Sequence, residues 1–392
     1  MDVFDVIVIG AGMAGASVAA ELAPNASVLV LEREKQPGYH STGRSAAAYI
    51  PSYGFDNPSL RLLTECSFNF LASPPADFQI QTLMHRRGLL SLCPPEYTVS
   101  VETELEKLQM GIPNIVKVGR EGIRQRIPII NDEYSKAGWF EPDVFDMDVH
   151  ALHSGYLKAL KQAGAQVLSN CAIEAVARDQ GVWTVSTDSA RYSAPVIVNA
   201  AGAWADEFAM LAGVDRLGLM PLRRTAVLLD PPVGCDVSEW PLVMAADGSF
   251  YLKPDAGLIL ASPADESPSV ACDAQPEELD IAYAVYFAQT ALNLEVKQVR
   301  HSWAGLRTFA CDRTPVIGFD ASTDGFFWLA GQGGHGIQIA PAAARLAASL
   351  ILENRVPLDL EEVGFNRDSV APERLTSISD QVTVDLLNAV KR

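Results

Sequence analysis

The sequence predicts an α/β fold in which a Rossmann-like dinucleotide-binding domain with a parallel sheet is joined to a second domain with a mainly antiparallel sheet. Two observations predict it. Residues 1–35 read as a strand, a glycine-rich turn, a helix and a second strand, the opening unit of a dinucleotide-binding fold. Residues 216–305 alternate apolar and polar positions and are interrupted by proline and glycine, as antiparallel strands are.

The first strand and its turn carry the most informative motif. Val6–Ile9 is an unbroken β-branched run, which suits a strand buried on both faces. Gly10, Gly12 and Gly15 follow as G-x-G-x-x-G. The first glycine permits a tight turn, the second lets a pyrophosphate approach the backbone, and the third lets the helix pack on the strand.

The residues after this turn complete the motif. Ala14–Ala23 is predicted as a helix whose N-terminus favours an anion. Ser27–Leu31 is a second strand, and Glu32 ends it twenty residues after Gly12, where a carboxylate can accept both ribose hydroxyls. A glycine-rich turn that binds no nucleotide is the alternative, and the position of Glu32 argues against it.

Composition limits the classes of function. The chain has 392 residues, 48% of them hydrophobic and 20% charged, which are globular values that suit more than one domain. The net charge of −18 argues against nucleic acid and anionic membrane surfaces as partners. No apolar run approaches the ~20 residues of a membrane-spanning helix.

The cysteines and histidines indicate neither disulfides nor a metal site. Six scattered cysteines form no C-x-x-C pair, and the first strand begins almost at Met1, which leaves no room for a signal peptide. We therefore expect a reduced, cytoplasmic protein. His150 and His153 lie one turn apart on a predicted helix but have no evident third ligand, so no metal is predicted.

A polar stretch after Glu32 extends the expected nucleotide site. Residues 36–54 read as a loop that leads into a short helix from Gly43 to Tyr49. Ser41, Thr42, Arg44 and Ser45 lie in it and are suited to a second set of cofactor contacts. A polar surface loop is the alternative.

Several motifs together give the chain a resemblance to a known family. They are the N-terminal fingerprint with HSTGRSAA (40–47), NAAGAW (199–204), SFYLKPDAG (249–257), WAGLR (303–307) and GQGGHGIQ (331–338). In this order they resemble the D-amino acid oxidase-like (DAO) family of FAD-dependent oxidoreductases. Within it, the chain is most similar to bacterial D-amino acid dehydrogenases of the D-arginine type.

The resemblance implies FAD as cofactor and a defined reaction. The enzyme would oxidise the α-amine of a D-amino acid by hydride transfer to flavin N5. The imino acid would hydrolyse to a 2-oxo acid and ammonia, and oxygen or a quinone-like acceptor would reoxidise the flavin. A secondary-amine oxidase of the sarcosine or glycine oxidase kind is the alternative enzyme, and a non-catalytic flavin-carrying subunit is the alternative outside enzymes.

The resemblance also implies the site residues. Arg307 matches the arginine that binds the substrate carboxylate, Arg224 a second pocket arginine, Tyr251 a tyrosine that helps the carboxylate, and Tyr53 a lid tyrosine. Gly334 and His335 complete the expected catalytic set, with the loop GQGGHGIQ facing the flavin. We expect the cofactor to contact Gly10, Gly12, Met13, Ala14, Gly15, Glu32, Arg33, Ser41, Thr42, Gly43, Arg44, Ser45, Ala46, Ala172, Ala201, Gly202, Trp204, Gly333, Gly334, Gly336, Ile337 and Gln338.

Departures from the arginine-using relatives bear on the substrate. Ala48 stands where a histidine is expected, and residues 86–92 (RRGLLSL) carry no acid. Leu242 and Met244 lie in a predicted wall strand, so neutral or apolar D-amino acids are expected over D-arginine. Covalent flavin attachment at Cys311 is a weaker alternative, because its spacing matches the relatives poorly.

We expect the domains to be discontinuous. Residues 1–80, 145–215 and 306–370 would form the FAD-binding domain, residues 81–144 and 216–305 the substrate-binding domain, and residues 371–392 a peripheral tail. Further helices are expected over residues 57–70, 101–110, 119–126, 149–162, 204–211, 277–292 and 337–353, and strands over residues 80–92, 166–194, 195–201 and 325–330.

Overall fold

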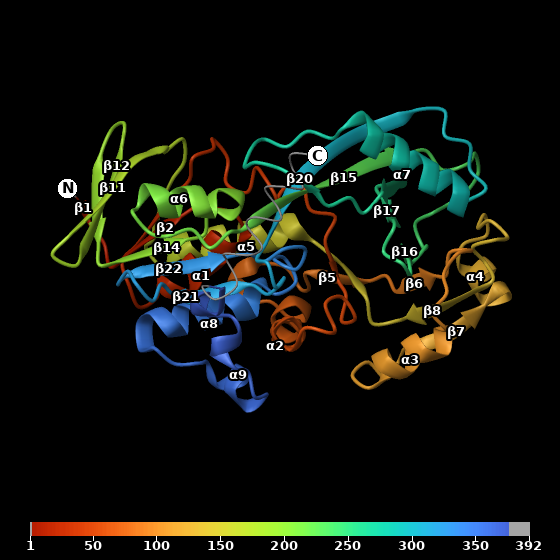
Figure 1. Ribbon diagram of the computed structural model, residues 1–392, viewed down its shortest axis with the longest axis horizontal. Coiled ribbons are helices and arrows are strands. Elements are labelled where there is room, and N and C mark those ends of the chain that lie inside the picture. The colour runs from red at the N-terminus through yellow and green to blue at the C-terminus, as the bar shows by residue number, and fades with distance from the viewer. Residues whose placement is uncertain (1, 376–392) are drawn as a thin grey trace.

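The computed structural model describes residues 2–375. It places a parallel sheet with its helices at one end of an elongated molecule and a large antiparallel sheet at the other (Figure 1). The described helices are α1 (Met13–Leu22), α2 (Pro58–Ala72), α3 (Val101–Gln109), α4 (Arg120–Arg126), α5 (Val149–Gln162), α6 (Ala205–Leu211), α7 (Glu278–Ala291), α8 (Ala340–Glu353) and α9 (Leu358–Glu362). The fold class is thus the predicted α/β arrangement.

The first sheet is parallel except at one edge. Its strands lie in the order β10 (Gln166–Leu168), β3 (Val28–Leu31), β2 (Val6–Ile9), β14 (Val196–Asn199), β22 (Phe326–Ala330) and β21 (Val316–Phe319). Only β21 runs antiparallel to its neighbour. Strands from three distant parts of the chain therefore meet around β2, whose carboxyl end leads into the glycine-rich turn.

The alternation of side chains along these strands builds a core on each face. Val6 and Val8 pack with α1 and α8 on one face. Ile7 and Ile9 point to the other face, toward α6 and a four-stranded sheet. That sheet has the order β1 (Asp2–Val3), β13 (Arg191–Ala194), β12 (Val182–Thr187) and β11 (Ile173–Asp179). Burial on both faces explains the uninterrupted apolar runs.

The second large sheet has nine strands and is antiparallel except between β6 and β16. Its strands run in the order β19 (Ser267–Pro268), β15 (Met220–Leu229), β18 (Leu258–Ser262), β17 (Tyr251–Asp255), β16 (Leu242–Ala245), β6 (Leu89–Leu92), β8 (Ala137–Glu141) and β7 (Val116–Gly119), with β20 (Val299–Phe309) paired to β15. Helix α7 contacts β15 and β18. The long β15–β20 pair brings Arg224 and Arg307 to neighbouring strands.

The helix predicted over 43–49 is wrong. Residues up to Arg44 form turns, and β4 (Ala48–Tyr49) instead joins β9 (Phe145–Met147) and β5 (Met84–Arg86) in a small sheet. Trp303 Nε1 donates to the Arg44 carbonyl oxygen at 3.0 Å. These contacts with distant strands outweigh the local preference of the small residues for a helix.

Two further segments differ from expectation. Helix α8 begins at Ala340 rather than at 337, because Pro341 occupies its first turn, where its missing N–H is tolerated. Val370 and Leu375 are buried in the two cores of the parallel sheet, so the first residues of the predicted tail are packed rather than peripheral. Residues 376–392 of that tail lie outside the described residues, and the domain boundaries stay a prediction, with β20 crossing the one placed at 305/306.

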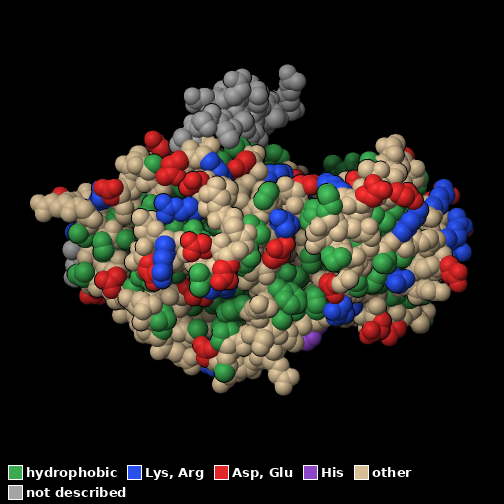
Figure 2. Space-filling model, turned by 90° about the horizontal axis from the view of Figure 1, so that it is seen from below, with side chains coloured by type: hydrophobic (Ala, Val, Ile, Leu, Met, Phe, Trp, Pro, Cys, Tyr) green, Lys and Arg blue, Asp and Glu red, His purple; other side chains and the backbone are tan. Residues whose placement is uncertain are grey.

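The described residues carry no helix that is both long and apolar enough to cross a membrane. Within the same residues, no group of three or more histidine, cysteine or acidic side chains is arranged to hold a metal ion. Figure 2 shows acidic and basic side chains interspersed on one face, with basic ones most numerous at the end formed by α3, α4 and β7.

Candidate functional site

A cavity of about 640 Å³ runs from the carboxyl ends of β2 and β3 to the β15–β20 pair. Its two ends differ in chemistry. One end is lined by the glycine-rich turn and the segment after it, and the other by Arg224, Arg307, Tyr251 and Tyr53. Ligands commonly bind at the carboxyl ends of strands in open α/β sheets. We refer to this space as the main cavity.

The glycine-rich turn has no room for side chains. Gly10 has a φ of +95°, and a Cβ there would lie 2.7 Å from the Ala200 carbonyl oxygen. A Cβ on Gly15 would lie 1.8 Å from the Gly10 carbonyl oxygen. The turn therefore holds α1 close against β2, with the N-terminus of α1 facing the main cavity, as a bound pyrophosphate requires.

Glu32 closes this end of the cavity. Its side chain is buried, and its Oε2 and Oε1 accept hydrogen bonds from the backbone N–H groups of Ala11 and Glu34, each at 2.8 Å. These bonds fix the carboxylate at the end of β3 and leave it further acceptor capacity for ribose hydroxyls. The glycine cradle and this carboxylate together fit the adenosine and diphosphate parts of FAD.

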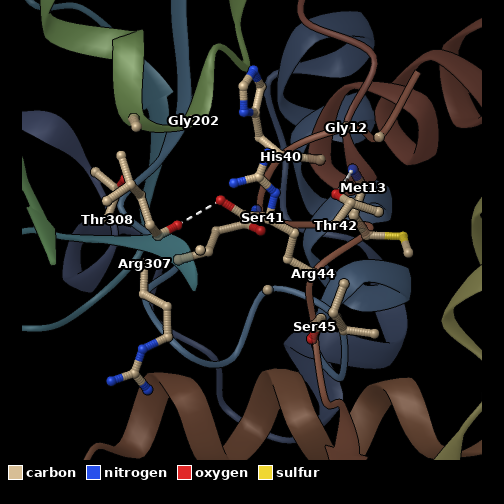
Figure 3. A pocket seen from close by; sticks show the side chains of 18 of the residues that line it. Gly12, Met13, His40, Ser41, Thr42, Arg44, Ser45, Gly202, Arg307 and Thr308 are labelled. Atoms are coloured by element: carbon tan, nitrogen blue, oxygen red, sulfur yellow. Dashed lines mark hydrogen bonds between the residues drawn. The ribbon is translucent and has the colours of Figure 1, made fainter. Parts of the chain in front are cut away.

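The segment after β3 is bound to both ends of the site, as Figure 3 shows. Thr42 Oγ1 accepts a hydrogen bond from the Met13 N–H at 2.9 Å, and Ser41 Oγ donates to the Leu306 carbonyl oxygen. Arg44 Nη1 donates to the Ala274 and Ala304 carbonyl oxygens at 2.8 and 3.0 Å. The segment that caps α1 thereby also fixes the strand that carries Arg307.

The opposite end of the main cavity is positively charged. Arg307 Nη1 donates to the Tyr53 hydroxyl at 3.2 Å, and the guanidinium of Arg224 lies 5.9 Å from the centre of the Tyr251 ring. Burial and the nearby charge of Arg307 lower the pKa of Arg224. Two guanidiniums held close together in a partly dry space favour an anion between them.

Gly334 lies in the glycine-rich loop GQGGHGIQ (331–338) and leaves room for two side chains of the site. A Cβ there would lie 2.4 Å from the Tyr53 hydroxyl and 2.9 Å from Arg307 Nη1. Only a glycine therefore permits these two side chains to meet. In the same loop, Gln338 Oε1 accepts a hydrogen bond from the Ile50 N–H, and its Nε2 donates to Thr64 Oγ1.

Most of the predicted site residues line the main cavity. They are Gly10, Gly12, Met13, Ala14, Glu32, Arg33, Ser41, Thr42, Arg44, Ser45, Ala46, Tyr53, Ala201, Gly202, Trp204, Arg224, Tyr251, Arg307, Gly333, Gly334, Gly336, Ile337 and Gln338. The structure thus brings together residues that are up to 328 positions apart, since the set spans Gly10 to Gln338.

Four predicted residues do not line this cavity. Gly15 packs against Gly10, and Gly43 lies in a tight turn where a Cβ would meet the Gly38 carbonyl oxygen at 2.7 Å. Ala172 is exposed, whereas its neighbour Cys171 lines the cavity. His335 is the fourth. Gly15 and Gly43 shape the site through the backbone rather than by contact with a ligand.

His335 instead lies behind Tyr53. The two rings stack with centroids 4.2 Å apart, and His335 lines a second cavity of about 860 Å³ that shares Ile50, Tyr53 and Met244 with the main cavity. Burial and the charges of Arg307 and Arg313 lower the pKa of His335 to about 3. Its neutral ring therefore supports Tyr53 and stands outside the main cavity.

Other residues at the site are not predicted by the sequence motifs. Cys171, Met244, Trp303 and Thr308 line the main cavity, and of these the sequence suggests only Met244, as part of a wall strand. Glu266 is the most consequential omission, because its carboxylate contacts both Arg307 and Arg224. The acidic pair in PADES (263–267) was the only available signal, and it has no characteristic spacing.

The loop that carries Tyr53 is fixed by a buried acid. Glu141 accepts hydrogen bonds from the Ser52 N–H at 3.2 Å and the Ser52 hydroxyl at 2.5 Å. Its side chain is fully buried, and this burial raises its pKa to about 7, from an ordinary value of 4.5, despite the hydrogen bonds from Ser52 that act in the opposite direction.

This geometry predicts a pH-dependent stability. The folded protein holds the Glu141 proton more tightly than the unfolded chain does, so this proton stabilises the fold. Its contribution to the free energy of unfolding is complete below pH ~4.5 and is lost as the pH rises to ~7, a change of about 3 kcal/mol. Urea unfolding near pH 5 and pH 8 should show a smaller pH dependence in Glu141→Gln than in the wild type. Glu174→Gln, which removes an exposed carboxylate, should behave as the wild type, and equal pH dependence in all three proteins would contradict the assignment.

Comparison with known proteins agrees with this geometry. Residues 5–350 match the DAO family, described as FAD dependent oxidoreductase. "Uncharacterized oxidoreductase YurR" of Bacillus subtilis is 26% identical over 90% of this chain and 96% of its own length. FAD-dependent oxidoreductase domain-containing protein 1 of Bos taurus is 25% identical over 89% of this chain and 81% of its own.

Solved structures share the fold. L-proline dehydrogenase from P. horikoshii superimposes with a TM-score of 0.81, at 21% identity, over 96% of this chain and 98% of that chain. Glycine oxidase from Geobacillus kaustophilus gives 0.79, at 20% identity, over 94% and 99%. With the family match over 5–350 and a cavity that fits a dinucleotide, the chain belongs to the DAO family of FAD-dependent oxidoreductases, and its cofactor is FAD.

Proposed function

We propose that the protein oxidises the α-amine of D-amino acids, with a preference for neutral or apolar side chains. One observation carries the proposal: Arg307 and Arg224 line the same cavity as the FAD-binding turn, with Tyr251 and Tyr53 beside them. We interpret this arrangement as a carboxylate-binding site at the far end of the dinucleotide cavity. The D configuration rests on the resemblance of WAGLR, SFYLKP and HSTGRSAA to D-amino acid dehydrogenases.

The residues of this chain would bind and orient the substrate. When bound, FAD supplies the acceptor for the hydride that leaves the amine-bearing carbon. Arg307 binds the substrate carboxylate, and the Tyr53 hydroxyl, which is held by Arg307 Nη1, closes over it. The oxidised imino acid would hydrolyse to a 2-oxo acid and ammonia.

Apolar residues support the preference for neutral side chains. Ile50, Leu242 and Met244 line the main cavity and pack in one cluster with Tyr53, whose hydroxyl is bound by Arg307. Residues 86–92 do not line the main cavity, and Arg86 and Arg87 pair with Asp143 and Asp146, so the absence of an acid among them does not set the preference. A cationic side chain placed among Ile50, Leu242 and Met244 would lose hydration without gaining a partner carboxylate there.

Two other functions have support. Dimethylglycine dehydrogenase of Rattus norvegicus, of which this chain spans 44%, is named for an N-methylated glycine, and this similarity supports the alternative of an amine oxidase of the sarcosine or glycine oxidase kind. The chain is also similar to "Hydrogen cyanide synthase subunit HcnC" of Pseudomonas aeruginosa. This similarity supports the alternative of a different class, a non-catalytic flavin-carrying subunit.

The proposal is tested by mixing the holoenzyme anaerobically with D-leucine, L-leucine, D-arginine, glycine and sarcosine, and recording the loss of flavin absorbance. We expect D-leucine to reduce the flavin with the highest second-order rate constant. Faster reduction by sarcosine would favour the secondary-amine oxidase, and a higher value for D-arginine would contradict the predicted preference. A flavin-carrying subunit would be reduced by none of them. Repetition with a dye acceptor and then with oxygen alone identifies the class of acceptor.

A further inference from the structure

Glu266 joins three arginines beside the positive end of the main cavity, and of these four residues Arg224 and Arg307 line that cavity. Its Oε1 lies 2.9 Å from Arg307 Nη2, 2.7 Å from Arg313 Nη2 and 3.5 Å from Arg224 Nη2, and its Oε2 lies 2.9 Å from Arg313 Nη2. The three arginines come from β20, the loop after it and β15. We call Arg224, Arg307 and Arg313 the arginine cluster.

The loop that carries Glu266 is held rigidly. Asp265 Oδ1 accepts a hydrogen bond from the Thr225 N–H at 2.7 Å, and Arg224 Nε donates to the Asp265 carbonyl oxygen at 2.8 Å. Ala264 has a φ of +50°, a conformation that costs energy for a residue with a side chain and needs surrounding contacts to persist. Glu266 is therefore placed at the arginine cluster by several contacts outside its own side chain.

The arginine cluster and its two acidic neighbours, Asp265 and Glu266, differ by one in their numbers of charged groups. The arginine cluster contributes three positive charges, and Asp265 and Glu266 contribute two negative ones when ionised. Burial raises the pKa of Asp265, and the hydrogen bonds from Thr225 and the charge of Arg224 oppose this shift. Burial raises the pKa of Glu266, but the hydrogen bond from Arg313 and the charges of Arg307, Arg313 and Arg224 outweigh burial and lower it overall, so Glu266 is ionised near neutral pH. The described charges of this group thus leave one positive charge, which matches a single substrate carboxylate.

We propose that Glu266 is a specificity-determining residue that restricts the main cavity to substrates with one carboxylate. Arg307 and Arg224 both line the cavity, so a dicarboxylate could reach both guanidiniums. Glu266 lies outside the lining but contacts both guanidiniums, so its charge neutralises part of theirs and repels a second carboxylate held between them. The inference rests on the proposed function, since it defines which amino acids that function accepts: neutral ones rather than aspartate or glutamate.

Glu266→Gln tests the proposal, because it removes the charge and keeps the shape. The oxidised holoenzyme is titrated with acetate and with malonate, and binding is followed by the change in flavin absorbance. We expect the affinity for malonate to rise about ten-fold more than the affinity for acetate, as the loss of one nearby charge in a partly screened site implies. The ratio of kcat/KM for D-glutamate to that for D-leucine should rise in the same direction.

The matched control is Glu277→Gln. Glu277 pairs with Arg223, which does not line the main cavity, whereas Glu266 contacts Arg307 and Arg224, which do line it. The loss of Glu277 should therefore change neither ratio. Glu266→Ala serves as a second variant and should show the same preference for malonate. Two results in Glu266 variants with wild-type FAD content would overturn the proposal. One is an unchanged or lowered ratio of malonate affinity to acetate affinity, and the other is no malonate binding. Because neither anion is oxidised, the titration reports on Glu266 even if no amino acid reduces the flavin, a result that contradicts only the proposed function.

Discussion

Arg307→Met is expected to lower kcat/KM for D-amino acids about a thousand-fold, because two charge-assisted hydrogen bonds of ~1.5–3 kcal/mol each would be lost. In the structure, Arg307 Nη1 binds Tyr53, Nη2 binds Glu266, and the buried Nε has no hydrogen-bond partner within the described residues. Loss of the clamp would also misplace the reacting carbon, so kcat should fall together with affinity.

The matched variant is Arg307→Lys, which keeps the charge but loses the planar fork. We expect a drop of about a hundred-fold, with FAD content unchanged in both proteins. Simple amines without a carboxylate should be poor substrates of the wild type and little affected by either change. Near-normal kcat/KM in Arg307→Met would assign the carboxylate clamp to Arg224 instead.

Gly15→Ala is expected to abolish FAD binding. Its Cβ would lie 1.8 Å from the Gly10 carbonyl oxygen, so α1 must move away from β2 and the turn must open. Overpacking of this kind costs about 3 kcal/mol. Wild-type protein should be yellow and release one FAD into the supernatant on acid precipitation, whereas the variant should carry less than about a tenth of it and should melt at a lower temperature.

Gly122→Ala is the control for this substitution. Gly122 lies within α4, and a Cβ there would come no closer than 3.6 Å to a neighbour, so FAD content should not change and stability should be equal or slightly higher. Normal FAD content in Gly15→Ala would contradict the assigned role of the turn. Colour that remains in the wild-type pellet would indicate covalent attachment and would make Cys311 the first residue to test, although it does not line the main cavity.

The parallel core and the glycine-rich turn could be predicted from residues that lie close together in the chain. Val6–Ile9 is apolar at every position because both faces of β2 are buried, and this pattern can be recognised without coordinates. Gly10, Gly12 and Glu32 could be assigned because their roles depend on backbone geometry within one βαβ unit, which is set by residues near in sequence. Arg307 could be suggested only because its neighbours in WAGLR resemble a known family.

The charges that surround Arg307 depend on contacts between distant parts of the chain. Glu266 lies 41 residues earlier in the chain, and its contact with Arg307 depends on the register of β15 with β20 and on the loop at Ala264. The missing helix over 43–49 has the same explanation, because Ser41 binds Leu306, 265 residues away. Local sequence determines the structural preferences of neighbouring residues. These contacts instead form between strands that are distant in the chain and meet only in the folded protein.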